Sequence, residues 1–266
     1  MLKLVDVHVH LSELSNPEEK IRDALMIGVE KFVSSVIRRE NLDRELILRE
    51  KFPGHIYISV GYMPGTWNAN EFLEWFEKIK SSVIAIGEVG LDFGRDITRD
   101  EIEMQIADFK TILEYARDND IPVIVHSRNA GKHAIEVVNN IKYDRVLFHA
   151  FDGSPKYAKR THYYFSVPPS IVRSPQKQSL VESLPLEQLL LETDAPALGP
   201  SKDEENEPKN ILYSLREISR IKSTTYTPAI PDQFQLNRSP HSLTCPNLDA
   251  YVSEITTKNA EYFFDF

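Results

Sequence analysis

The sequence predicts a (β/α)₈ barrel, and three features of the chain indicate this fold class. Its 266 residues suit one large domain or two small ones. Short runs rich in β-branched residues alternate with longer segments of helical periodicity. Eight such runs lie at Leu4–His8, Lys31–Ile37, His55–Val60, Val83–Glu88, Pro122–His126, Arg145–His149, Tyr163–Val167 and Leu189–Glu192. Eight strands with intervening helices in roughly 250 residues are the content of a TIM barrel.

Most of these runs are continuously apolar rather than alternating. This pattern is typical of strands that are buried on both faces of a parallel sheet. A doubly wound open sheet is the alternative fold. The barrel is favoured over it because no GxGxxG or GxxxxGK[ST] motif stands at any junction between a strand and a helix.

The segments between the runs carry helix signals. Asn16-Pro17 followed by two acids predicts a cap and a first turn. Thr98 to Glu101 is a capping-box pattern, and Pro208 predicts the start of another helix. A final helix is expected from Ala250. Each of the helices expected after Thr98, from Pro208 and from Ala250 has an apolar face. In that order, the faces consist of Ile102, Ile106, Phe109, Leu113 and Ala116; Ile211, Leu215 and Ile218; and Val252, Ile255, Ala260 and Phe263.

Residues Ser223–Asp249 fit no element. They contain four prolines, carry three charged residues and show neither helical nor alternating periodicity. We therefore expect a single domain over residues 1–266 with an irregular insertion at about 223–249. The insertion is either a surface excursion or a loop with a role as lid or partner-binding segment.

Composition excludes several classes of protein. The chain has 31 basic and 40 acidic residues, a net charge of −9, which argues against binding nucleic acid by bulk electrostatics. Cys245 is the single cysteine, so no intramolecular disulfide forms, as suits a reducing compartment. No apolar stretch approaches the roughly 18 residues of a membrane span, and the N-terminus lacks the apolar core of a signal peptide. These features predict a cytoplasmic protein with no membrane partner.

Metal-binding residue types gather where the predicted strands end. His8 and His10 lie two apart at the end of the first run, so both side chains can reach one metal ion. The other candidates are Glu88, His126, His149 and Asp194, at or just past the fourth, fifth, sixth and eighth runs. A barrel brings all strand C-termini to one face, where the active site lies. A buried cluster of this composition without metal would leave polar groups unsatisfied.

The ligand set predicts two metal ions. Four imidazoles and two carboxylates suit Zn²⁺, Mn²⁺ or Fe²⁺ better than Ca²⁺. Six protein ligands exceed one catalytic site with an open position, but they fit two ions bridged by a carboxylate. Glu88 is the natural bridge because its strand lies between the first and the fifth in sequence.

Six motifs in order resemble the TatD family of metal-dependent deoxyribonucleases, which are amidohydrolase-type barrels. They are Asp-x-His-x-His-Leu (6–11), Gly-Glu-Val-Gly-Leu-Asp (87–92), Pro-Val-Ile-Val-His-Ser-Arg (122–128), His-Ala-Phe-Asp-Gly-Ser (149–154), Leu-Glu-Thr-Asp-Ala-Pro (191–196) and Asn-Glu-Pro (206–208). Thr-Thr-Lys-Asn-Ala (256–260) resembles the family's C-terminal signature. The match covers Val5–Lys222 and Ala250–Phe264.

The resemblance implies a role for each position. His8, His10, Glu88 and Asp194 would surround one metal, and Glu88 with His126 and His149 would surround the other. Asp194 would also orient or deprotonate the attacking water. The implied activity is hydrolysis of phosphodiester bonds in DNA, commonly from 3′ to 5′ on single strands. It needs two divalent metal ions per subunit, with Mg²⁺, Mn²⁺ and Zn²⁺ as candidates, and short single-stranded DNA ends as substrate; no stable protein partner is evident.

Four features depart from the family pattern. Met63 stands where a histidine is frequent, and Phe93 stands where a tyrosine is usual. Glu205 replaces a basic residue, in surroundings that predict an acidic rim repelling a polyanion. The segment Ser223–Asp249 has no counterpart in the family.

Substrate contacts and competing functions stay open. Arg128 is a candidate phosphate clamp or a surface ion pair. Trp67 and Tyr62 either stack on bases or pack in the core. The alternative activity is metal-dependent hydrolysis of a small amide, lactone or cyclic ester on the same barrel. A third possibility, a scaffold without turnover, is disfavoured by the intact ligand set.

Overall fold

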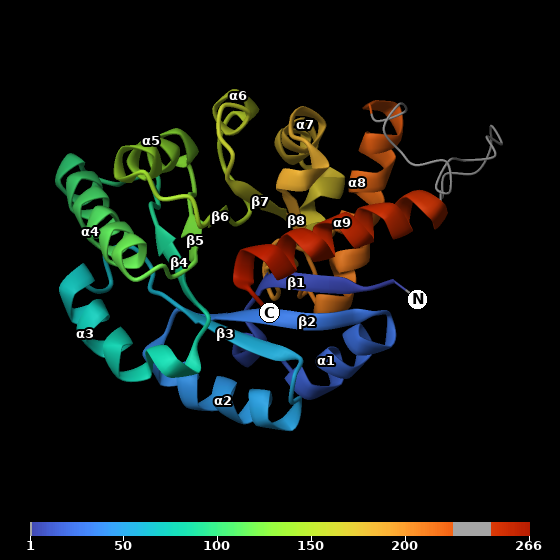
Figure 1. The fold of residues 1–266 in the computed structure, drawn as a ribbon, viewed down its shortest axis with the longest axis horizontal. Coiled ribbons are helices and arrows are strands. Elements are labelled where there is room, and N and C mark those ends of the chain that lie inside the picture. The colour runs from blue at the N-terminus through green and yellow to red at the C-terminus, as the bar shows by residue number, and fades with distance from the viewer. Residues whose placement is uncertain (1, 226–245) are drawn as a thin grey trace.

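The computed structural model describes residues 2–225 and 246–266, and its described part forms an eight-stranded parallel sheet (Figure 1). The strands follow one another in sequence order around the sheet. They are β1 (Leu4–Val9), β2 (Val29–Val36), β3 (Ile56–Val60), β4 (Ala85–Gly90), β5 (Val123–His126), β6 (Val146–Phe148), β7 (Tyr164–Val167) and β8 (Leu189–Leu191). All eight predicted strands are thus confirmed, with shifts of one or two residues at most ends.

The sheet curls into a nearly closed TIM barrel. Consecutive strands pair in parallel from β1 to β8, for example with Phe165 opposite Leu189. The seam between β8 and β1 is joined just past the strand ends. There the amide of Asp194 donates to the carbonyl of His8 at 2.9 Å, and the amide of His10 donates to Ala195 at 2.8 Å. These two bonds place the segment after β8 against the end of β1.

Helices surround the sheet (Figure 1). Both the capping box at Thr98 and Glu101 and the helix after Pro208 are confirmed, although a 3₁₀ turn, Pro208–Asn210, precedes the second. The side chain of Asn16 makes no capping bond, because its backbone is left-handed with φ of 50°. The helices are α1 (Pro17–Met26), α2 (Leu42–Lys51), α3 (Ala69–Ile79), α4 (Arg99–Asp118), α5 (Gly131–Ile141), α6 (Pro155–Ala158), α7 (Pro175–Ser183), α8 (Ile211–Thr225) and α9 (Pro246–Phe264).

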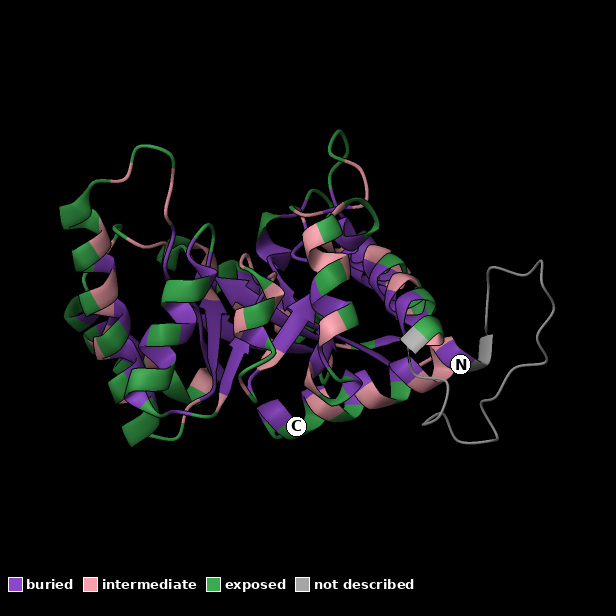
Figure 2. Ribbon diagram, turned by 90° about the horizontal axis from the view of Figure 1, so that it is seen from above, coloured by how far each residue is buried: buried purple, intermediate pink, exposed green. Residues whose placement is uncertain are grey.

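Helix α9 lies at the end of the barrel where the strands begin. The hydroxyls of Ser253 and Thr257 both donate to the carbonyl of Lys3, just before β1. Phe263 and Phe264 pack in one buried cluster with strand residues such as Val7. The opposite end, where the strands finish, is therefore left for the candidate site. Burial is deepest in the sheet and on the helix faces against it (Figure 2).

The predicted irregular stretch is wrong at both edges. Residues 223–225 complete α8 and residues 246–249 begin α9. The rest of the predicted insertion, with Cys245, lies outside the described residues. Among those that are described, no helix has the length and apolar character to cross a membrane.

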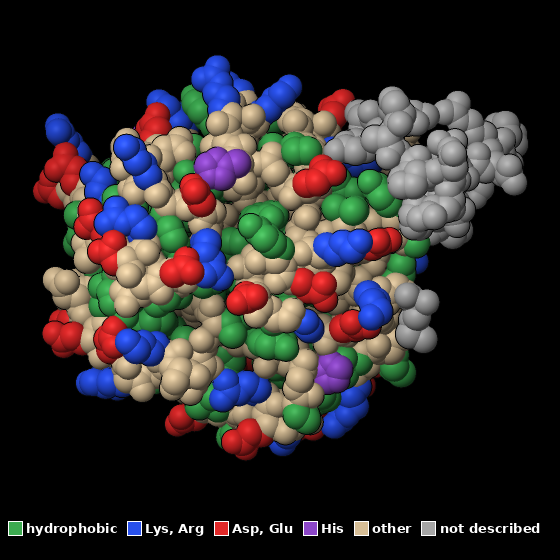
Figure 3. Space-filling view, in the orientation of Figure 1, with side chains coloured by type: hydrophobic (Ala, Val, Ile, Leu, Met, Phe, Trp, Pro, Cys, Tyr) green, Lys and Arg blue, Asp and Glu red, His purple; other side chains and the backbone are tan. Residues whose placement is uncertain are grey.

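Acidic and basic side chains are interspersed over the face shown in Figure 3. Mixed charge of this kind provides no extended positive track for a polyanion on that face. The face agrees with the net charge of −9 in arguing against binding by bulk electrostatics.

Candidate metal centre

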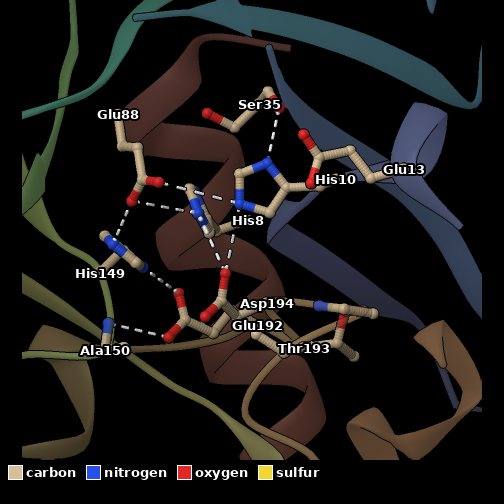
Figure 4. A network of polar contacts seen from close by, with 12 residues as sticks. His8, His10, Glu13, Ser35, Glu88, His149, Ala150, Glu192, Thr193 and Asp194 are labelled. Atoms are coloured by element: carbon tan, nitrogen blue, oxygen red, sulfur yellow. Dashed lines mark hydrogen bonds and ion pairs between the residues drawn. The ribbon is translucent and has the colours of Figure 1, made fainter. Parts of the chain in front are cut away.

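The six predicted ligands converge where the strands end. His8 lies in β1 and His10 directly follows it, Glu88 lies in β4, His126 ends β5, and His149 follows β6. The sixth, Asp194, lies three residues past β8. Five of them are less than a tenth exposed, and the side chain of His126 is 14% exposed. Sequence reasoning therefore identified a set of residues that the fold does bring together, and all of them except His126 are labelled in Figure 4.

One group of these side chains surrounds the carboxylate of Asp194. Its Oδ1 lies 3.4 Å from Nε2 of His8 and 3.4 Å from Nε2 of His10. Tetrahedral ligands at about 2.0–2.2 Å from one ion are themselves roughly 3.3 to 3.6 Å apart. These three residues therefore have the spacing of ligands to a common cation.

A second group meets at the carboxylate of Glu88. Its Oε2 lies 2.5 Å from Nε2 of His149 and 3.1 Å from Nδ1 of His126. Those two ring nitrogens are themselves 3.1 Å apart. Glu88, His149 and His8 also form a set whose ligand atoms lie within reach of one ion.

Unpartnered nitrogens in this buried cluster fit the binding of a cation. Both ring nitrogens of His8 and Nδ1 of His149 are buried without a hydrogen-bond partner. Such groups are costly to bury unless something binds them. A divalent metal ion coordinated by imidazole and carboxylate ligands would satisfy these nitrogens.

The carboxylates set the charge of the imidazoles. Burial lowers the pKa of His8 to about 4, and repulsion from the nearby His149 acts in the same direction. Burial also acts against protonation of His10, but Asp194 and Glu88 prevail and raise the pKa of His10 to about 9. His10 also places Nδ1 2.8 Å from the carbonyl of Ser35, which leaves Nε2 facing the two carboxylates.

Asp194 reaches the centre through an unusual backbone. Its φ is 53°, a left-handed conformation that non-glycine residues rarely adopt. The preceding Thr193 is anchored by Asp6, which accepts from its amide at 2.9 Å and its hydroxyl at 2.5 Å. Asn206 adds a bond from Nδ2 to the carbonyl of Thr193 at 2.7 Å. These contacts hold the strained turn in place.

Glu88 is held by close backbone packing between β3 and β4. The amide of Tyr62 donates to the carbonyl of Glu88 at 3.1 Å. A Cβ atom on Gly61 would lie 2.0 Å from that same carbonyl oxygen. Position 61 therefore requires glycine, because any side chain would displace the backbone of Glu88.

Family comparison agrees with this geometry. The family described as TatD related DNase matches residues 5–265, nearly the whole chain. The chain belongs to the TatD-related DNase family. It is therefore a hydrolytic enzyme acting on ester bonds, and its buried His, Glu and Asp clusters indicate binding of divalent metal.

Individual TatD relatives support the same assignment. The chain is 36% identical to deoxyribonuclease TATDN3 of Homo sapiens over 242 residues, covering 82% of this chain and 87% of the relative. It is 31% identical to an uncharacterized metal-dependent hydrolase of Methanocaldococcus jannaschii, covering 83% and 90%. In fold it is similar to the crystal structure of a TatD homologue of Escherichia coli, with a TM-score of 0.79, 24% identity and coverage of 99% and 98%.

Further acids support the TatD ligands, and sequence reasoning missed their roles. Asp92 accepts from Nε of Arg128 at 2.9 Å and lies 3.3 Å from Nε2 of His126. Glu192 accepts from the amide of Ala150 at 2.8 Å, and its other oxygen lies 3.8 Å from Nδ1 of His149. Both acids stood within the TatD motifs, but the sequence does not show which ring each one faces.

Arg128 and two departures from the TatD pattern, Phe93 and Met63, have identifiable surroundings. Arg128 forms the predicted ion pair, with Asp92, while its side chain remains 61% exposed. Phe93 packs edge-on against the ring of His133. Met63 is half-buried beside Tyr62, which packs against Phe72 in the core.

Two of the four acids in the predicted acidic rim, Glu205 and Glu207, form ion pairs, while Asp203 and Glu204 stay exposed. The carboxylate of Glu205 lies 2.6 Å from the ammonium of Lys20 and also accepts from Ser15. Glu207 lies 2.6 Å from the ammonium of Lys209. Lys20 and Lys209 therefore offset the charges of Glu205 and Glu207, and repulsion of a polyanion by the rim stays a prediction.

Proposed function

We propose that this protein is a deoxyribonuclease that removes nucleotides from the 3′ ends of single-stranded DNA, using water activated by two divalent metal ions. The observation that carries the proposal is the convergence of four histidines and two carboxylates at one end of the barrel. Membership of the TatD family supports phosphodiesters as the ester class. The name of the human relative supports DNA as the substrate.

Two overlapping ligand sets would hold the ions. His8, His10, Glu88 and Asp194 would bind one, and Glu88, His126 and His149 would bind the other. When bound, two such cations supply positive charge for the phosphate oxygens and lower the pKa of an attacking water toward neutrality.

Asp194 is the proposed general base. Although burial acts in the opposite direction, the nearby imidazoles of His10 and His8, each 3.4 Å from its Oδ1, keep the pKa of Asp194 well below the usual range, so the carboxylate is ionised. Its left-handed backbone and the anchoring of Thr193 by Asp6 hold the accepting oxygens at the centre. Glu88 would hold the two groups of imidazoles together. The exposed Arg128 would contact the phosphate of the substrate.

The deciding experiment follows end-labelled single-stranded DNA with purified protein. The protein is stripped with chelator and reloaded with Mg²⁺, Mn²⁺ or Zn²⁺, and a substrate with a phosphorothioate 3′ end tests the direction of attack. We expect metal-dependent shortening from the 3′ end and a loss of roughly 10²- to 10⁴-fold in rate for Asp194→Asn, the range of general base catalysis. Asp203→Asn, an exposed carboxylate on the loop after β8, is the matched control.

Four results would contradict the proposal. Cleavage that resists chelator, or equal cleavage by Asp194→Asn, would overturn the mechanism. Failure to cleave DNA together with metal-dependent hydrolysis of amides or lactones would favour a small-molecule hydrolase. Bound metal without hydrolysis of any ester or amide would indicate a binding protein.

A further inference from the structure

A pocket of about 390 Å³ opens beside the candidate metal centre. This volume lies toward the lower end of the roughly 300–1,000 Å³ of small-ligand sites. None of its lining residues is one of the six predicted ligands. Its walls come from the segments after β2 and β3 and from α3, and they include Arg38, Arg39, Glu40, Tyr62, Trp67 and Trp75.

Backbone contacts join this pocket to the metal ligands. Gly61 and Tyr62, in its wall, pack on the carbonyl of Glu88, to which the amide of Tyr62 donates at 3.1 Å. The carbonyl oxygen of Ser35, three residues before Arg38, lies 2.8 Å from Nδ1 of His10 and accepts a hydrogen bond from it. The pocket is therefore adjacent to the reacting centre, on the side of β2 and β3.

The walls combine aromatic rings with cations. Trp67 is half-buried and meets Trp75 edge-on at 5.5 Å between ring centroids. The guanidinium of Arg39 lies 5.7 Å from the ring of Trp75. Arg38 is 67% exposed, and its Nε lies 3.9 Å from a carboxylate oxygen of Glu13, so its pairing is loose.

This set of groups matches the parts of a nucleotide. Aromatic side chains stack on bases regardless of sequence, and guanidinium groups contact phosphate. The carboxylate of Glu40 accepts hydrogen bonds only, so it suits an exocyclic amino group rather than a phosphate. Two arginines next to tryptophan are notable in a chain with an excess of acids. A base stacked inside a duplex would not present its face to Trp67.

We propose that this pocket holds a nucleotide of the single strand next to the phosphodiester that is cleaved, with Trp67 stacking on its base and Arg38 and Arg39 contacting its phosphate. The proposal rests on the proposed function, since it concerns the substrate of the same centre. It assigns affinity for single strands to a local site and not to overall charge. Tyr62 contributes packing, because it is buried against Phe72.

The kinetic test compares two substrates of the metal-loaded enzyme. One is a single-stranded oligonucleotide, and the other is methyl p-nitrophenyl phosphate, a diester whose only ring leaves on cleavage. Trp67→Ala should lower kcat/KM for the oligonucleotide roughly five- to hundred-fold, the range of base–aromatic stacking. It should leave turnover of the small diester unchanged, and Trp67→Phe should restore most of the loss. Tyr262→Ala, which removes an exposed aromatic ring from α9, is the control.

An abasic substrate tests the same contact without altering the protein. Placing an abasic nucleotide beside the cleaved bond should slow wild-type enzyme as much as Trp67→Ala does, and it should slow the variant no further. Equal losses on both substrates, or unchanged oligonucleotide kinetics in Trp67→Ala, would overturn the subsite while leaving the proposed function intact. Wild-type enzyme that cleaves neither diester would instead contradict the proposed function.

Tryptophan fluorescence gives a readout independent of catalysis. The chain has two tryptophans, and both line this pocket. Deoxycytidine monophosphate or a short oligodeoxycytidylate, whose base carries an exocyclic amino group, should quench their emission saturably, and Arg38→Ala should weaken that binding. Emission that does not change on titration of wild-type protein would refute the assignment of the pocket, whatever the enzyme hydrolyses.

Discussion

Glu88 Oε2 and His149 Nε2 lie 2.5 Å apart at the centre of the candidate site. The same carboxylate group reaches the other three imidazoles, at 3.1 Å for His126, 3.7 Å for His8 and 3.9 Å for His10. Among the described residues, no other carboxylate lies within 4 Å of a ring nitrogen of all four histidines; Asp194, for example, lies this close only to His8 and His10. Glu88 is therefore the residue whose charge all four imidazoles share, and three of these rings, those of His8, His10 and His149, are labelled with it in Figure 4.

Replacing Glu88 by Gln should disrupt both proposed metal sites. The neutral amide keeps the shape but removes the charge that carboxylate ligands offer a hard cation. We expect bound metal to fall from two equivalents per chain to one or none, measured by elemental analysis after desalting, with DNase activity lost in parallel. Glu204→Gln, an exposed acid after β8, should retain both equivalents. Two tightly bound equivalents in Glu88→Gln would refute a bridging role.

A glycine pair tests the packing that holds Glu88. Gly61→Ala would place a Cβ 2.0 Å from the carbonyl oxygen of Glu88, whereas a Cβ on Gly94 meets nothing within 4 Å. Overpacking of this kind costs about 1–3 kcal/mol, so urea unfolding should show that loss for Gly61→Ala. Metal affinity should fall with it. Gly94→Ala should change neither quantity, and equal behaviour of the two variants would contradict the close-approach argument.

Much of the fold could be predicted because strand burial leaves a local signal. Runs such as Pro122–His126 are apolar on both faces, and ligands such as His126 stand at their ends. The barrel then brings strand ends together by topology alone. The helix edges at 223–225 and 246–249 were missed because prolines and polar residues there weaken the helical pattern.

Pairings between distant residues could not be predicted in this way. Lys20 and Glu205 are 185 positions apart, and Asp6 and Thr193 are 187 apart. A single sequence shows that Glu205 is an acid but not that a lysine faces it. The prediction of a repulsive rim used local charge alone, and the distant Lys20 offsets the charge of Glu205 itself.

The anchoring of Thr193 by Asp6 should contribute to stability even without metal. Asp6 is fully buried, and burial raises its pKa well above the usual range against the hydrogen bonds from Thr193. Asp6→Ala leaves the amide and hydroxyl of Thr193 without their acceptor, which we expect to cost about 2–3 kcal/mol. Asp6→Asn retains an acceptor and should cost less. Urea unfolding in chelator measures both, and exposed Asp96→Ala is the control. A loss in Asp6→Ala no larger than in Asp96→Ala would show that the anchor contributes nothing.

The ion pair of Glu205 and Lys20 should make stability depend on pH in acid. Hydrogen bonds from Lys20 and Ser15 lower the pKa of Glu205 from its ordinary 4.5 to about 2 in the folded protein. Because the folded pKa lies below the unfolded one, the contribution is fully present above pH 4.5 and is lost as the pH falls toward 2. The carboxylate is 35% exposed, so we expect about 1 kcal/mol or less at neutral pH. Urea unfolding of wild type and Glu205→Gln should differ by a constant amount from pH 5 to 7, and the difference should shrink below pH 4.5. Glu204→Gln should show no such convergence, and a difference for Glu205→Gln that persists unchanged to pH 3 would contradict the lowered pKa.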